Sequence, residues 1–285
     1  MDLNHPLFES IVLPLTMTLV LSGALRGMLG ERWGKNLAAA AIGLSVLFAY
    51  TLIFGAPAWS PRTGLQKLPL IMALLMVGGV LLDVLKPGRA TTAWAALAAT
   101  GATALWLGEP QLAGDGGDVA PLLILTSLIA LLSLAGLVAA PAEGAYRCSL
   151  ILPVALGLAG ASFNAGSMAL MQTSLTLAAA VGGFALWNWP TPRMPFGATG
   201  IAVSGMGCFA LALLLVLLTE IRPWALLPLA LIFAMVPVAH RLPRPARFGR
   251  AAVEPLYITA MGLIPMILTI ILAHNPAPAD GLYYR

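Results

Sequence analysis

The chain has 285 residues, of which 60% are hydrophobic and only 9% charged, with a formal net charge of +4 at neutral pH. A soluble domain of this length carries about 25% charged residues, so this composition excludes a protein surface exposed to water on all sides. The basic residues stand in short gaps beside apolar segments, a pattern typical of membrane topology and not of nucleic-acid binding.

Ten stretches of nearly uninterrupted apolar sequence follow one another along the chain. Runs of about 20 apolar residues match the hydrocarbon thickness of a bilayer, and a backbone in lipid must form its hydrogen bonds within helices. We therefore predict an all-α membrane protein, a bundle of about ten transmembrane helices in a single domain over 1–285, with no soluble domain. The predicted crossings are 8–28, 36–55, 66–86, 90–107, 119–140, 146–161, 166–187, 196–219, 222–240 and 254–274.

The stretch 146–187 is too long for one ordinary crossing and has no charged residue after Arg147. Its middle, 160–167, consists of small residues with Asn164 between two glycines, which is typical of a tight turn. The sequence therefore predicts two helices joined at this point.

The distribution of basic residues predicts the orientation. With ten helices and both termini outside, 11 of the 15 basic residues face the cytoplasm, as the positive-inside rule requires. A single helix over 146–187 would instead move the four arginines of the loop 241–250 outside. We therefore expect a bacterial inner (cytoplasmic) membrane protein with both termini on the periplasmic side. The inner set is Arg26, Arg32, Lys35, Lys86, Arg89, Arg147, Arg193, Arg241, Arg244, Arg247 and Arg250, and the outer set is Arg62, Lys67, Arg222 and Arg285.

Ten helices also divide into possible halves, 1–142 and 143–285, and an odd-numbered unit inserts its second copy upside down. Leu13-Pro14 and Leu152-Pro153 occupy similar places in the first helix of each half. The chain contains 22 prolines, however, so chance explains this similarity equally well. A five-plus-five inverted repeat and a bundle without internal symmetry both remain open.

The crossing 166–187 is the most polar of the ten. Gln172 and Thr176 lie four residues apart and therefore share one helix face, with Asn164 expected at the start of this helix. An uncompensated amide in lipid is unfavourable, so this face should point into the bundle. We predict Asn164, Gln172 and Thr176 as a substrate-binding set, and hydrogen bonds between helices are the alternative explanation.

Ionisable and reactive residues are scarce within the crossings. Asp83 stands three residues before Lys86, which predicts an ion pair at the membrane interface. The small residues Gly200, Ser204 and Cys208 repeat at four-residue spacing and predict a close-packing helix face. The three histidines occupy segment ends, and the sequence contains no zinc, nucleophile or phosphate-binding motif. We therefore expect no enzyme activity, no cofactor and no metal.

Two functions are compatible with these features. The first is a small-solute transporter or permease for a neutral or zwitterionic substrate, with a central cavity lined by 166–187 and shaped by helices that prolines kink. The second is a non-catalytic scaffold or assembly subunit of a larger membrane complex, which binds membrane-protein partners through its polar and glycine faces. The partners are then the lipid bilayer together with either a small solute or another membrane protein.

Overall fold

The computed structural model describes residues 8–113, 119–236 and 250–274. This part of the chain is helical and contains no strand, with one isolated β-bridge between Glu143 and Pro195. Seven of its helical segments are long and apolar enough to cross a membrane. The chain is therefore an all-helical protein with the helices of a multi-pass membrane protein.

The first half of the chain forms five helical segments along the predicted stretches. They are a π-helical turn Phe8–Val12 (η1) continued by α1 (Leu13–Leu29), a π-helical turn Gly30–Gly34 (η2) with α2 (Lys35–Leu37) and α3 (Ala40–Phe54), α4 (Gly64–Leu85), α5 (Arg89–Leu112) and α6 (Val119–Ala139). Of these, α3 is apolar but has only 15 residues, and α5 is long but less apolar than the others.

The second half contains α7 (Gly144–Asn164) and α8 (Met168–Asn188). A broken helix follows, made of α9 (Gly197–Gly200), a π-helical turn Ile201–Gly205 (η3) and α10 (Met206–Leu218). The last elements are a 3-10 turn Pro223–Leu226 (η4) with α11 (Leu227–Ala234), and α13 (Arg250–Ala273). The π-helical turn η3 interrupts the regular ladder of hydrogen bonds inside this crossing.

The prediction that 146–187 forms two helices is confirmed. Gly166 adopts a left-handed conformation (φ +74°) that glycine tolerates better than other residues. The Gly166 and Ser167 N–H groups donate to the Phe163 and Ser162 carbonyls and close the end of α7. Asn164 was expected at the start of the second helix, but it is the last residue of α7, and α8 begins at Met168.

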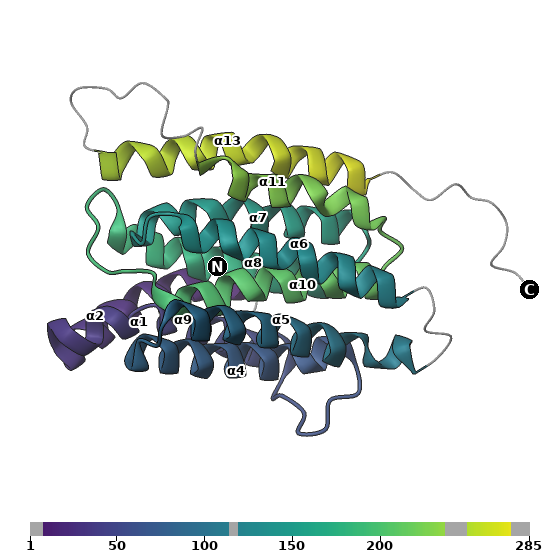
Figure 1. Cartoon of the computed structure of the whole chain (residues 1–285), viewed down its shortest axis with the longest axis horizontal. Coiled ribbons are helices and arrows are strands. Elements are labelled where there is room, and N and C mark those ends of the chain that lie inside the picture. The colour runs from purple at the N-terminus through teal and green to yellow at the C-terminus, as the bar shows by residue number, and fades with distance from the viewer. Residues whose placement is uncertain (1–7, 114–118, 237–249, 275–285) are drawn as a thin grey trace, which may run out of the picture.

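The helices α7 and α8 form the centre of the bundle (Figure 1). α7 packs against α8, α10, α11 and α13, whereas α8 packs against α1, α3, α7 and α10. The largest fully buried side chains of this region are Tyr146, Phe184 and Phe196. The rings of Phe184 and Phe196 meet edge to face with centroids 5.8 Å apart.

The contact between α1 and α8 is unusually close. A Cβ atom on Gly183 would lie only 2.3 Å from the Leu15 carbonyl oxygen. One turn further along both helices, the Trp187 indole N–H donates to the Leu19 carbonyl at 2.6 Å, and its ring lies against Gly23. Since the paired positions advance together, the two helices run parallel and side by side.

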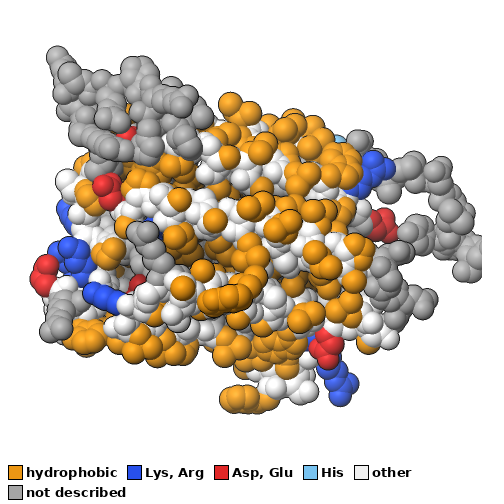
Figure 2. Space-filling view, in the orientation of Figure 1, with side chains coloured by type: hydrophobic (Ala, Val, Ile, Leu, Met, Phe, Trp, Pro, Cys, Tyr) orange, Lys and Arg blue, Asp and Glu red, His pale blue; other side chains and the backbone are white. Residues whose placement is uncertain are grey.

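Charged side chains gather at the two ends of the helices, with hydrophobic side chains between them (Figure 2). At one end the Lys67 ammonium donates to Glu109 Oε2 at 2.9 Å and to the Trp106 carbonyl at 2.7 Å. At the other end Arg147 donates to the Val138 and Ala140 carbonyls, both at 3.1 Å, where α6 ends. This arrangement matches a bilayer normal that runs along the helices.

Asp83 makes contacts that differ from the expected pair with Lys86. Its carboxylate accepts hydrogen bonds from the Ala198 N–H (2.7 Å), the Thr199 N–H (2.9 Å) and the Thr199 hydroxyl (2.6 Å). These are the free N–H groups at the start of α9, where a negative charge is favoured. The side chain therefore caps a helix 115 residues away in the chain instead of pairing within α4.

The prolines occupy two kinds of position. Pro14 and Pro228 lie in the first turns of α1 and α11, where each α-helix continues directly from the π-helical turn η1 or the 3-10 turn η4. Pro153 and Pro265 lie inside α7 and α13. Pro237 and the loop arginines Arg241, Arg244 and Arg247 fall outside the described residues.

Candidate functional site

The three residues predicted to bind a substrate lie in two different environments. Asn164 is half-buried at the end of α7, and its amide donates to the Ile270 carbonyl of α13 at 2.8 Å. Gln172 is half-buried on α8, and Thr176 is 1% exposed one turn further along. The amide of Asn164 therefore links α7 to α13. A hydrogen bond between helices is the alternative to substrate binding for this residue.

The interior around Thr176 is packed. The hydroxyls of Thr176 and Ser174 are both buried without a hydrogen-bond partner among the described residues. None of the four hollows described below is lined by Gln172 or Thr176. The structure thus places these two residues outside these four hollows, and their role in substrate binding stays a prediction.

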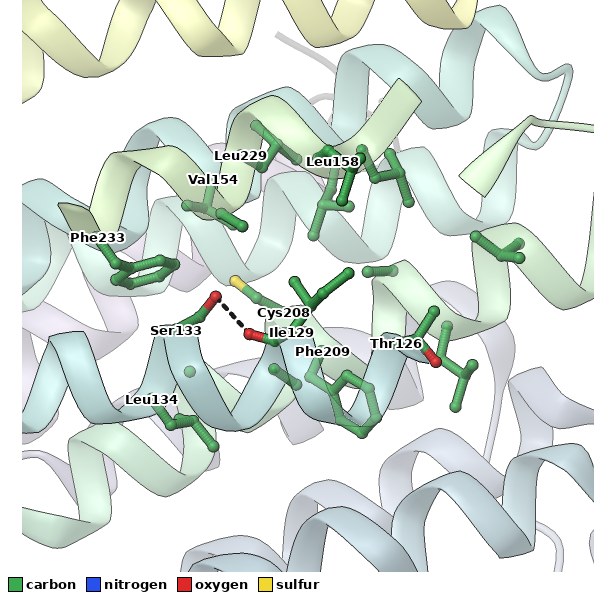
Figure 3. Close-up of a pocket in the computed structure, with 18 of the residues that line it drawn as sticks. Thr126, Ile129, Ser133, Leu134, Val154, Leu158, Cys208, Phe209, Leu229 and Phe233 are labelled. Atoms are coloured by element: carbon green, nitrogen blue, oxygen red, sulfur yellow. Dashed lines mark hydrogen bonds between the residues drawn. The ribbon is translucent and has the colours of Figure 1, made fainter. Parts of the chain in front are cut away.

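Open space lies instead between α6, α7, α10 and α11. A partly open hollow of about 110 Å³, here called the groove, is lined by side chains of these helices and of η4. Its lining is apolar except for two hydroxyls and one thiol and contains no charged side chain. Figure 3 shows Val154, Leu158, Cys208, Phe209, Leu229 and Phe233 around this space.

The polar atoms of the groove have limited capacity for hydrogen bonds. The Thr126 hydroxyl donates to the Leu122 carbonyl at 2.8 Å, and the Ser133 hydroxyl donates to the Ile129 carbonyl at 2.8 Å (Figure 3). Since both protons are used within α6, each oxygen can only accept a further hydrogen bond. The thiol of Cys208 is free and buried. The groove can therefore hold an apolar molecule with at most a few donor groups.

A second hollow, here called the outer hollow, adjoins the groove between α6 and α11. Its volume is about 640 Å³. It is also lined by Leu132 and Leu231, which are 66% and 59% exposed. The two hollows share the lining residues Ile129, Ser133, Leu227, Ala230 and Phe233. The groove therefore continues toward the outside of the bundle, where lipid would lie.

Small side chains and a short helix explain why this region is hollow. The facing positions Ala130, Gly205, Ala212 and Ala230 leave volume that larger side chains would fill. α11 has only eight residues and follows a 3-10 turn, so it covers a smaller part of α6 than a full crossing would. The groove thus arises from residue size and helix length together.

Two further crevices lie at the ends of the helices. One, of about 600 Å³, is lined by Asn164, Ser167, Glu220 and Arg222 where α7, α8, α10 and α13 meet. The other, of about 550 Å³, is lined by Arg26, Glu31, Trp187 and Arg193 at the opposite end. Asn164 therefore borders open space, but at the surface and apart from Thr176.

No protein-family model matches this sequence, and no related sequence is found among curated proteins. The function must therefore be inferred from the geometry of the chain. Among the described residues, no group of three or more His, Cys, Asp and Glu side chains is placed to bind a metal ion. The groove is the candidate functional site because it combines a partly enclosed space between four helices, an uncharged lining and a connection to the outside.

Sequence analysis did not identify the groove. The one available signal was the row of small residues Gly200, Ser204 and Cys208, which predicted a close-packing helix face. In the structure Cys208 and neighbouring Gly205 line the groove, although Gly205 also lies close to the side chains of Leu134 and Leu137. An apolar stretch carries no mark that distinguishes a side chain facing a hollow from one facing lipid.

Proposed function

We propose that this protein is a multi-pass membrane carrier, or permease, that binds a neutral and largely apolar molecule in the groove. One observation supports this proposal above all others, namely that an uncharged, partly enclosed hollow between helices of the bundle continues into a hollow at its lipid-facing side. A zwitterionic substrate is disfavoured, because burying its charges without charged partners is strongly unfavourable.

The size of the groove suggests what part of a ligand it holds. A cavity of about 150 Å³ lined by apolar side chains stays dry and binds benzene. The groove, at about 110 Å³, matches one branched or unsaturated segment of a longer chain, and the remainder of the chain would occupy the outer hollow. We therefore propose an acyl or polyisoprenoid chain with a neutral head group as the class of ligand.

The proposed topology keeps ten crossings, with both termini on the periplasmic side of a bacterial cytoplasmic membrane. Seven helices have the required length and hydropathy, and the remaining three proposed crossings contain α3, α5 and η4–α11. The excess of basic residues on one side, 11 against 4 among the 15 of the sequence, supports this orientation.

An inverted repeat is not needed for this function. The helices α1 and α7 would be equivalent in such a repeat, as would α6 and α13. α7 packs extensively along α13, whereas α1 packs mainly along α3 and α8. The two halves therefore differ in how their first and last helices meet.

The proposed carrier is also non-enzymatic, because the described lining of the groove offers no carboxylate, histidine or amine.

The experiment is a thermal-stability assay of the purified protein with two groups of ligands, long-chain neutral lipids and polar zwitterionic metabolites. A ligand that binds only the folded state adds about 2.7 kcal/mol of stability at a hundredfold excess over its dissociation constant. We expect a shift with an apolar ligand and none with zwitterions. Ala230→Phe fills the space shared by the two hollows and should abolish the shift.

Two matched variants complete this experiment. Ala98→Phe adds the same ring to an exposed position of α5 and should leave the shift unchanged. Gln172→Leu, on the polar face of α8, should also leave it unchanged. A shift with zwitterions that Gln172→Leu removes would contradict the apolar carrier and support a polar site on α8.

A membrane assembly subunit is the second candidate function. The outer hollow contains Gly136 and the 43% exposed Trp224, and small residues beside a hollow allow close approach of another helix. A stoichiometric membrane partner that is retained by the wild type and by Ala98→Phe but lost from Ala230→Phe would favour this function. The partner helix would then occupy the place assigned here to the ligand.

A further inference from the structure

The crevice between α1 and α8 has the features of an anion site. It is lined by Arg26, Glu31, Trp187 and Arg193, together with the glycines Gly23, Gly27 and Gly30. It lies at the helix ends opposite to Glu220 and Arg222. Its two arginines come from segments separated by more than 160 residues in the sequence.

Arg193 is held in place by neighbouring groups. Its guanidinium carbon lies 5.8 Å from the centre of the Trp187 ring, within the range of a cation–π interaction. Its backbone N–H donates to the Asn188 side-chain oxygen at 3.1 Å, and the Trp187 indole is fixed by its bond to Leu19. One wall of the crevice is therefore ordered before any ligand binds.

Arg26 can bind a ligand although it forms an ion pair with Glu31. Its guanidinium donates to Glu31 Oε1 at 3.1 Å, and the side chains are 30% and 79% exposed. An ion pair this exposed contributes little stability, so an incoming anion can replace Glu31. The crevice carries two guanidiniums against one carboxylate, which leaves one net positive charge for the ligand.

We propose that this crevice binds a phosphate group, and that the phosphate belongs to the head group of an anionic phospholipid. Guanidinium groups bind phosphate oxygens through paired hydrogen bonds, and basic pockets between membrane helices bind anionic head groups. The elements around the crevice present exposed apolar side chains, with Met28 85%, Leu186 55% and Trp33 47% exposed. Acyl chains would lie along this surface.

The opposite end of the bundle supplies a matched control. Arg222 stacks over Trp224 at 5.9 Å, as Arg193 stacks over Trp187. The crevice lined by Arg222 contains Glu220 as its other charged residue, so these two charges cancel. An arginine on a tryptophan is therefore present at both ends, but among the four hollows described above only the α1–α8 crevice is lined by two arginines.

Native mass spectrometry tests this proposal on the full-length protein in mixed micelles with equal amounts of phosphatidylglycerol and phosphatidylcholine. The wild type should retain phosphatidylglycerol selectively. Arg26→Gln and Arg193→Gln should each reduce this retention roughly tenfold, the effect of losing one hydrogen-bonded charge. Arg222→Gln should retain as much as the wild type.

Three outcomes would overturn the proposal. The first is equal retention of the two lipids by the wild type, and the second is an equal loss in Arg222→Gln. The third concerns the source of the phosphate: stabilisation by inorganic phosphate alone that Arg193→Gln removes, without selective lipid retention, would assign the crevice to a soluble anion. Size-exclusion profiles of all variants show whether each remains folded. None of these outcomes depends on whether the groove binds a ligand.

Discussion

The interior around α8 and the groove beside α6 are both uncharged, but they differ in how closely their atoms meet. At α8, a Cβ on Gly183 would touch the α1 backbone, and a Cβ on Gly207 of neighbouring α10 would lie 3.4 Å from Leu177 of α8. At the groove, the small residues Ala130 and Ala230 face a space of about 110 Å³. In this bundle the backbones of α1 and α8 approach closely, whereas the small side chains of the groove line open space.

The largest expected change in stability comes from two adjacent glycines of α8, which test how closely α1 and α8 pack. Gly183→Ala places a methyl group against the Leu15 carbonyl and should destabilise the protein by roughly 2–3 kcal/mol, the upper range for overpacking. Gly182→Ala meets its nearest atom at 3.9 Å and should be neutral or slightly stabilising, since alanine favours helices. Thermal unfolding in detergent measures both. Equal effects would show that α1 and α8 are not in close contact.

Two leucines compare the packed interior with the groove directly. Leu177 is fully buried on α8, and Leu134 is 6% exposed and lines the groove. Leu→Ala is more destabilising where the surroundings leave a larger new cavity. We expect Leu177→Ala to cost about 2 kcal/mol more than Leu134→Ala, because Leu134 already lacks neighbours on one side. The same unfolding assay applies, and a larger loss at Leu134 would mean that the groove is filled in the native protein.

The smallest expected effect concerns the polar face of α8. Thr176→Val keeps the shape of the side chain and removes a buried hydroxyl that has no partner among the described residues, so it should stabilise the protein by up to roughly 1 kcal/mol. Thr173→Val is the control, because the Thr173 hydroxyl donates to the Ala169 carbonyl at 2.8 Å and its loss should not stabilise. Destabilisation by Thr176→Val alone would indicate a ligand or water on this hydroxyl.

Apolar stretches of the sequence predicted an all-helical chain, in which seven described helices are long and apolar enough to cross a membrane. The glycines and Asn164 of 160–167 predicted the turn between α7 and α8, because turn chemistry depends on adjacent residues. The contacts of Asp83 were not predicted, since Lys86 is near in the chain whereas Thr199 is near only in the fold. The groove was missed for the same reason. Ser133 and Ala230 line the same hollows only because α6 packs on α11, and nothing local in the sequence marks either residue.

The hydrogen bonds of Asp83 also impose an order on biogenesis. Chains are made at about 5–20 residues per second, so the 115 residues between Asp83 and Ala198 require roughly 6–23 s of synthesis. During that interval the Asp83 carboxylate of α4 lacks the Ala198 and Thr199 N–H groups that will later donate hydrogen bonds to it. A bare carboxylate is strongly disfavoured in hydrocarbon, so α4 must stay at a depth where water or head groups reach this residue. The two parts of the nascent chain can lock together only after α9 has left the ribosome.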